Sequence, residues 1–147
     1  MNYIIRDCTP YDLPALVELC SKHAAYERAD YNPIGKIENL NLALFTEPKP
    51  LNCWVVEIDQ KLGGYCSFTY EYSTWNASYF IYMDCPYLDE DYRGHGIGEE
   101  LIKKLNVIAK EKGGLKLQWQ TPVFNERAIK FYRRLGAREK EKVRFYL

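Results

Sequence analysis

The chain has 147 residues, of which 47% are hydrophobic and 27% are charged, a composition typical of a globular protein. Its 20 lysine and arginine residues equal its 20 aspartate and glutamate residues, so no overall charge favours a nucleic acid, a membrane surface or an acidic partner. The length fits one domain, and we expect residues 1–147 to form it without nucleic-acid or membrane partners.

The five cysteines are scattered along the chain without a Cys-x-x-Cys pair, and only two histidines accompany them. This spacing predicts no metal site and indicates a reducing compartment. Cys53 and Cys66 lie in apolar runs, and we expect both to be small core residues. Residues 1–7 become polar too soon for a signal peptide, and no apolar run reaches membrane-spanning length, so we expect a cytoplasmic protein.

The first half of the chain begins with a short strand at residues 3–5 and two helical patterns. Thr9 and Pro10 suit the cap and the first position of a helix whose apolar stripe covers residues 13–24. A weaker helical pattern follows at residues 37–45. Three β-rich runs with short connections then predict an antiparallel meander. These runs are residues 53–58, 65–72 and 79–84.

The second half changes from a β-rich to a mainly helical rhythm. With the first half it predicts a mixed α/β domain, in which a mostly antiparallel sheet is flanked by four helices in the order β-α-α-β-β-β-α-β-α-β. The expected elements are a helix with an apolar stripe at residues 101–109, a strand at 115–120, a helix capped by Asn125 and ended by Gly136, and a last strand at 143–147.

A glycine-rich loop lies between the third strand of the meander and the strongest helical pattern. Its alternating glycines let the backbone turn tightly and leave room for a ligand. The helix start that follows exposes free N–H groups and a partial positive charge, which favour phosphate oxygens. We therefore expect the backbone amides of this loop to hold a pyrophosphate. They belong to Gly94, His95, Gly96, Ile97, Gly98 and Glu99.

Two other phosphate-binding loops fit the sequence poorly. A Walker loop needs Lys-Ser/Thr after its last glycine, and neither follows here. The dinucleotide fingerprint Gly-x-Gly-x-x-Gly needs glycine where this chain has Glu99. That fingerprint also normally closes the first strand of a βαβ unit, whereas four predicted strands come first here.

The loop and the last helix resemble the GCN5-related N-acetyltransferases (GNAT). The cofactor motif of that family, Gln/Arg-x-x-Gly-x-Gly/Ala, is matched by Arg93, Gly96 and Gly98. The resemblance covers nearly the whole chain and implies a splayed sheet, acetyl-CoA as cosubstrate and direct acetyl transfer to an amine. A second motif, Asn-x-x-Ala-x-x-Phe-Tyr-x-x-x-Gly-Ala/Phe, is matched by Asn125, Ala128, Phe131, Tyr132, Gly136 and Ala137.

Within this family, the chain is similar to the spermidine/spermine N-acetyltransferase group at residues 25–27, 72–75 and 82–98. It departs from the group at Asp84, which replaces a glutamate, at Cys85, which replaces the next acid, and in a shorter C-terminal segment. The group pairs its subunits, so the resemblance implies a homodimer.

The chemistry of acetyl transfer needs a neutral amine, a polarised carbonyl and protonation of the leaving thiolate. An alkyl amine has a pKa of roughly 10, so it arrives charged and must lose a proton. The resemblance implies that Asp84 takes this proton, directly or through water, and that Tyr26 and Glu27 contact the substrate, with Glu27 as the alternative base. It makes Tyr132 the general acid, with a pKa that cationic or dipolar neighbours lower. A turn residue, a solvated charge and a core aromatic remain the alternatives for Asp84, Glu27 and Tyr132.

Backbone groups of Tyr87 and Leu88 fall where the splayed strand of the family contacts the pantetheine arm. One of these N–H groups would stabilise the thioester oxygen. Asn125 would hold the pantetheine, cap its helix, or do both. Arg93 and Lys130 are candidate partners for coenzyme phosphates, or simply solvated charges.

We therefore expect an N-acetyltransferase that acts on a primary amine of a small, polyamine-like molecule. Gln118 and Trp119 would form the floor of its acceptor pocket, or else pack within the sheet. The alternatives are an amino-acid, peptide or protein N-acetyltransferase and a non-catalytic acyl-CoA-binding sensor. The aromatic and acidic residues suited to a cation are Tyr26, Glu27, Tyr70, Glu71, Trp75 and Asp84.

Overall fold

The computed structural model describes residues 1–147, and its elements follow the predicted order up to the last helix. A five-stranded sheet has the spatial order β1-β2-β3-β4-β5. No helix is both long and apolar enough to span a membrane. The strands are β1 (Tyr3–Asp7), β2 (Asn52–Ile58), β3 (Lys61–Ser73), β4 (Ser78–Leu88) and β5 (Lys116–Trp119). The helices are α1 (Leu13–Tyr26), α2 (Lys36–Phe45), α3 (Ile97–Glu111) and α4 (Glu126–Arg134).

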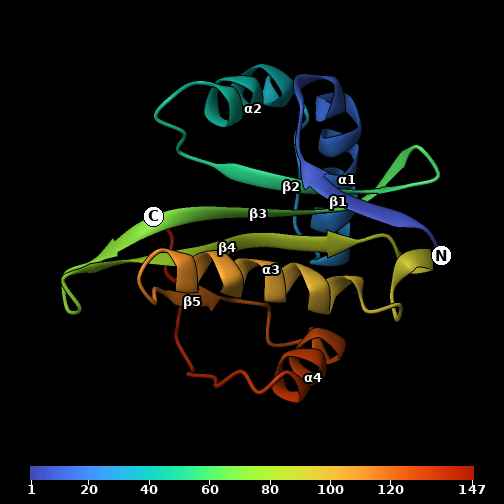
Figure 1. Ribbon diagram of the computed structural model, residues 1–147. Coiled ribbons are helices and arrows are strands. Elements are labelled where there is room, and N and C mark those ends of the chain that lie inside the picture. The colour runs from blue at the N-terminus through green and yellow to red at the C-terminus, as the bar shows by residue number, and fades with distance from the viewer.

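The helices cover both faces of the sheet, with α1 and α2 on one side and α3 and α4 on the other (Figure 1). Strand β2 contributes side chains to the core on both faces of the sheet, because successive side chains of a strand point to opposite faces. Trp54 and Val56 pack with α3 in one core cluster, whereas Cys53 and Val55 pack with α1 and α2 in the other. The prediction that Cys53 and Cys66 are core residues is confirmed, since both are buried.

The antiparallel meander is confirmed, and its strands β3 and β4 are longer than the sequence pattern indicated. β4 pairs with β3 as far as Leu88. On its other edge, β4 pairs with β5 in parallel, and only from Phe80 to Met83. Beyond Met83, the remaining residues of β4 have no strand beside them on this edge. The sheet is therefore splayed, and the opening between β4 and β5 positions the candidate site.

The predicted last strand, residues 143–147, is not formed. The chain after Ala137 is irregular and has no sheet partner. Val143 and Phe145 are 77% and 87% exposed. The alternation of side chains is typical of a strand, but a strand also needs a neighbouring backbone to bond with, and none lies beside this segment.

A charged cluster around Asp12 joins β1 to α1. Thr9 caps a short 3-10 turn that starts at Pro10, so α1 itself begins later than predicted, at Leu13. The Asp12 carboxylate accepts hydrogen bonds from the Arg6 guanidinium at 2.7 and 2.9 Å and from the Thr9 N–H at 2.8 Å. The bonds from Arg6 hold the pKa of Asp12 below its ordinary value, although burial acts in the opposite sense.

We expect Asp12→Asn to lower the free energy of unfolding by about 1–3 kcal/mol near neutral pH, because bonds to a charged partner are lost. Since folding lowers the pKa of Asp12, its stabilisation is present above the unfolded-state pKa of about 3.9 and is lost as the pH falls through the folded-state value. Urea unfolding of both proteins at about pH 7 and about pH 2.5 should therefore show a smaller difference at the lower pH. An equal difference at both would contradict this account.

Candidate active site

A large cleft lies where β4 and β5 part. Its volume is about 1330 Å³, which is large enough for an elongated ligand. The end of α1, the end of β4, the start of α3, one side of α4 and the C-terminal segment all contribute to it. Most of the predicted site residues meet here: Tyr26, Glu27, Asp84, Tyr87, Leu88, Arg93, Gly94, Gly96, Ile97, Gly98, Glu99, Asn125 and Tyr132.

Three predicted site residues are not among those that line the cleft. Gln118 and Trp119 lie on β5 where it still pairs with β4, and the chain reaches the cleft only from Gln120 onward. Trp119 instead packs edge-on against Tyr132, with ring centroids 5.2 Å apart. Trp119 therefore fits the sheet-packing interpretation, Gln118 is exposed, and neither residue lines the cleft. His95 is exposed on the glycine loop between two residues that do line the cleft.

The predicted aromatic and acidic set converges only in part, at Tyr26, Glu27 and Asp84. Its other members belong to the β3–β4 hairpin, whose tip projects from the opposite end of β4 (Figure 1). They therefore do not contribute to a cation site in this cleft. These residues are Tyr70, Glu71 and Trp75.

The glycine loop has a backbone suited to an anion. Gly94 and Gly96 both have φ of +81°, in the left-handed region that favours glycine. A Cβ at either position would have open space around it, so the requirement for glycine comes from the backbone conformation. Helix α3 begins at Ile97, and its first backbone bond runs from the Glu100 N–H to the Gly96 C=O. The N–H groups of residues 97–99 thus precede the helical ladder at the positive end of the helix dipole.

Basic side chains gather on the α4 side of the cleft. Arg127, Lys130 and Arg134 are three and four residues apart, which places them on one face of the helix, and all three line the cleft. Sequence reasoning singled out only Lys130, although the spacing of the three was available as a signal. This basic face of α4 therefore adds positive charge to one side of the cleft.

Arg93 is engaged with the cleft walls. Its Nε donates a hydrogen bond to the Leu88 C=O at 2.9 Å. Its guanidinium carbon lies 4.6 Å from the ring centroid of Tyr26 and 5.7 Å from that of Tyr87. Arg93 therefore connects α1 with the end of β4, and it occupies a carbonyl that was expected to contact the pantetheine arm.

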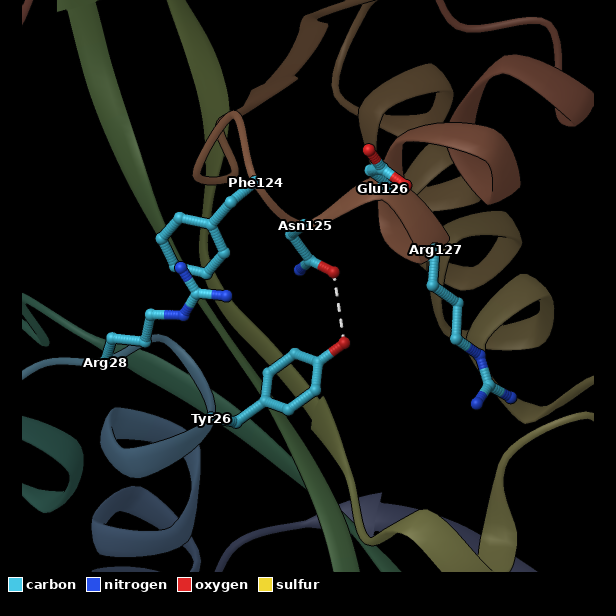
Figure 2. Close-up of a pocket in the computed structure, with 6 residues that line it drawn as sticks. All are labelled: Tyr26, Arg28, Phe124, Asn125, Glu126 and Arg127. Atoms are coloured by element: carbon cyan, nitrogen blue, oxygen red, sulfur yellow. Dashed lines mark hydrogen bonds between the residues drawn. The ribbon is translucent and has the colours of Figure 1, made fainter.

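Asn125 is hydrogen-bonded to Tyr26, as Figure 2 shows, and so links α4 with α1. Its Oδ1 accepts hydrogen bonds from the Tyr26 hydroxyl at 3.0 Å and from the Ala128 N–H at 3.4 Å. The predicted helix cap is thus confirmed, and the same oxygen also fixes Tyr26. Beside this pair, the Arg28 guanidinium lies 4.1 Å from the ring centroid of Phe124, along a side cavity of about 280 Å³.

The two residues with predicted catalytic roles line the cleft from different elements. Asp84, on β4, is exposed and accepts a 3.2 Å hydrogen bond from the Ser67 hydroxyl. Burial, followed by neighbouring Cys66 and Glu27, raises the pKa of Tyr132 on α4. The expectation of a lowered pKa is wrong, because burial of the phenol disfavours its charged form. Tyr132 therefore keeps its proton at neutral pH.

Sequence reasoning also missed lining residues from the C-terminal segment and from α1. Lys142, Arg144 and Tyr146 come from the C-terminal segment, where the apolar residues between them are exposed. Their alternation was visible in the sequence, but it was interpreted as a strand. His23 lines the cleft from α1, and its position in the apolar pattern of that helix gave no signal of a site.

Comparison with known proteins connects this geometry with a family. A family model described as "Acetyltransferase (GNAT) family" matches residues 16–137. The thialysine N-epsilon-acetyltransferase of Bos taurus is 31% identical over 144 residues, which cover 92% of this chain and 84% of that protein. The spermidine/spermine N(1)-acetyltransferase-like protein 1 of Homo sapiens is 25% identical over 149 residues, which cover 93% of this chain and 21% of that protein.

Solved structures show the same fold. An aminoglycoside acetyltransferase from an uncultured soil metagenomic sample matches with a TM-score of 0.82, over 99% of this chain and 95% of that chain, at 23% identity. This likeness concerns the fold alone. The family model, in contrast, spans most of the sequence and includes the glycine loop and all of α4. The chain therefore belongs to the GNAT family of acetyltransferases.

Proposed function

We propose that this acetyltransferase binds acetyl-CoA along the cleft and transfers the acetyl group to the primary amine of a small, polyamine-like molecule. One observation carries the proposal: a left-handed glycine loop at a helix start, a carboxylate on β4 and a protonated tyrosine on α4 line one cleft. The amides of residues 94–99 hold the diphosphate, because free N–H groups and the helix dipole favour phosphate oxygens. Arg127 and Lys130 offer further charge to phosphates.

The reaction follows from the positions of the two titratable groups. Asp84 takes a proton from the acceptor ammonium, directly or through water, which frees the nitrogen lone pair. The nitrogen attacks the thioester carbon to form the C–N bond, the C–S bond breaks, and the nitrogen loses its second proton to solvent. Tyr132 gives its proton to the departing thiolate and regains one from solvent. A backbone N–H near Tyr87 stabilises the oxyanion during the attack.

A second candidate acceptor is an amine that also carries a carboxylate, such as an amino acid. Burial raises the pKa of Tyr82, Asp84 adds to the increase and Arg144 opposes it, so a carboxylate and a guanidinium act on one phenol in the cleft. A ligand with one positive and one negative end satisfies both charges, whereas a diamine places its second positive charge near Arg144. The name of the bovine thialysine N-epsilon-acetyltransferase agrees with such an acceptor.

A cytoplasmic homodimer is also part of the proposal. The dimer is supported by the resemblance to the spermidine/spermine N-acetyltransferase group. The location is supported by the scattered cysteines.

Gly96→Ala should weaken CoA binding by roughly 5- to 20-fold, because an L side chain in the left-handed region displaces the loop amides. Gly113→Ala is the matched control, since Gly113 has φ of +92° and open space around its Cβ, yet it follows the far end of α3. Both variants should lose about 1 kcal/mol of stability, and only the first should lose affinity in isothermal titration calorimetry. Equal affinities for CoA would contradict the proposed diphosphate site.

Tyr132→Phe should lower kcat by about 10²- to 10⁴-fold with little change in the KM for acetyl-CoA, because a general acid acts in the transition state. Because its pKa is raised, the wild-type kcat should not decline with rising pH until above the ordinary tyrosine value of about 10. Steady-state rates across this pH range measure both effects. Tyr72→Phe, on the exposed hairpin, is the control. An unchanged kcat in Tyr132→Phe would remove this residue as the acid.

Lysine and cadaverine form a matched pair of acceptors, because they differ only in the carboxylate. If the acceptor carries a carboxylate, Arg144→Gln should lower kcat/KM for lysine by about 10- to 100-fold and should not lower it for cadaverine, since a charge-assisted contact is lost. Rates for the two amines in the wild type and the variant measure this. A lysine-to-cadaverine ratio that stays unchanged would exclude Arg144 from acceptor recognition and favour the polyamine-like acceptor.

A further inference from the structure

His23 is a buried polar residue of the cleft that the proposed reaction does not use. It lies on α1 with only 9% of its surface exposed, and both ring nitrogens have partners. Nε2 lies 2.5 Å from Glu27 Oε2, one helical turn away, and Nδ1 lies 2.9 Å from the Tyr65 hydroxyl on β3. The imidazole is therefore held from two elements.

The partners determine which nitrogen carries the proton. A carboxylate only accepts, so Nε2 donates to Glu27. Nδ1 then accepts from Tyr65, whose pKa is raised by burial and by the neighbouring thiols of Cys85 and Cys20, so that the phenol retains its proton. The ring consequently has a fixed tautomer with its N–H directed at Glu27.

Glu27 is poorly placed for the stability of α1. It follows the last residue of the helix, where a negative charge opposes the helix dipole. Its only side-chain hydrogen bond is the one from His23, while its carboxylate borders the cleft. Without that bond, the flexible glutamate side chain would sample several rotamers.

The same imidazole reaches the cofactor side of the cleft. It stacks on Tyr87, with ring centroids 5.2 Å apart and an interplanar angle of 22°. Tyr87 in turn lies under the Arg93 guanidinium. His23 thus contacts both an acidic group of the acceptor end and an aromatic wall beside the glycine loop.

We propose that His23 is a positioning residue for acetyl transfer, which fixes the Glu27 carboxylate in the cleft as a binding point for the acceptor ammonium in addition to Asp84. The inference rests on the proposed amine acceptor. Two carboxylates from α1 and β4 then hold the amine, and the imidazole aligns the first of them. His23 acts through Glu27, so the loss of His23 weakens acceptor binding more than it slows the chemical step.

Two substitutions separate the contacts of the ring. Glutamine places an amide N–H near the position of imidazole Nε2, whereas the shorter asparagine reaches only the position of Nδ1. His23→Gln should keep the KM for the amine within about 3-fold of wild type, and His23→Asn should raise it about 10-fold with a smaller change in kcat. Both variants lose the stacking on Tyr87, so the difference between them reports the Glu27 contact.

A double-mutant cycle that combines His23→Asn with Glu27→Gln completes the kinetic test. In the His23→Asn background, this second change should raise the KM of the amine little further, because the two residues act as one unit. Thermal unfolding confirms that the variants are folded. Equal KM values for His23→Gln and His23→Asn, or fully additive effects in the cycle, would overturn the proposal.

Hydrogen exchange of the His23 imidazole reports its contact with Glu27 independently of turnover. In ¹⁵N-labelled protein, the imidazole Nε2–H of His23 should exchange slowly with solvent and lose this protection in Glu27→Ala. Failure of the wild type to acetylate any amine would refute the proposed acceptor, while the protected proton would still support the positioning of Glu27. A rapidly exchanging Nε2–H in the wild type would overturn the role of His23 whatever the turnover.

Discussion

The parting of β4 from β5 after Met83 is the constraint on which the site depends. Parallel pairing holds the two strands together only from Phe80 to Met83, so the rest of β4 presents one edge of its backbone to the cleft. The start of α3 and one side of α4 border this opening, and α1 reaches it from the other layer. A fully paired sheet would satisfy these backbone groups internally and leave no room for a ligand.

Charge is divided within the cleft, although the whole chain is formally neutral. The basic face of α4 and the amides before α3 contribute positive charge, while Glu27 and Asp84 contribute negative charge from α1 and β4, and Glu99 and Glu126 add acids at the starts of α3 and α4. A cosubstrate with phosphates and an acceptor with an ammonium group therefore find different partners in one cavity. Arg144, from a segment outside the regular elements, acts on Tyr82 in opposition to Asp84, and this is why we propose that it takes part in the choice of acceptor.

Features that depend on local pattern could be predicted from the sequence, and features that depend on distant neighbours could not. The glycine loop, the apolar stripe of α3 and the cap at Asn125 follow from residue types within a few positions. The strand expected at 143–147 requires a partner backbone, and the place of Trp119 requires knowing where two strands separate. No local pattern contains either fact.

The same distinction explains the errors within the site. The pKa of Tyr132 is set mainly by burial, which results from packing of α4 against the rest of the domain. His23 has the spacing of a core residue on α1, and its hydrogen bond to Tyr65 depends on β3, which is distant in the sequence. Most of the other candidate residues that line the cleft were predicted from the family resemblance, because the motifs of a family mark residues that lie together in its fold.

The hydrogen bond between Tyr26 and Asn125 has a consequence for cooperativity. It joins the end of α1 in one helical layer to the start of α4 in the other, and both residues line the cleft. Because residues of α1 and α4 line the same cleft, a ligand that contacts both adds a second link between the two layers. The folded state then gains stability in proportion to the logarithm of the ligand concentration, and local opening of either layer becomes rarer while the cleft is filled.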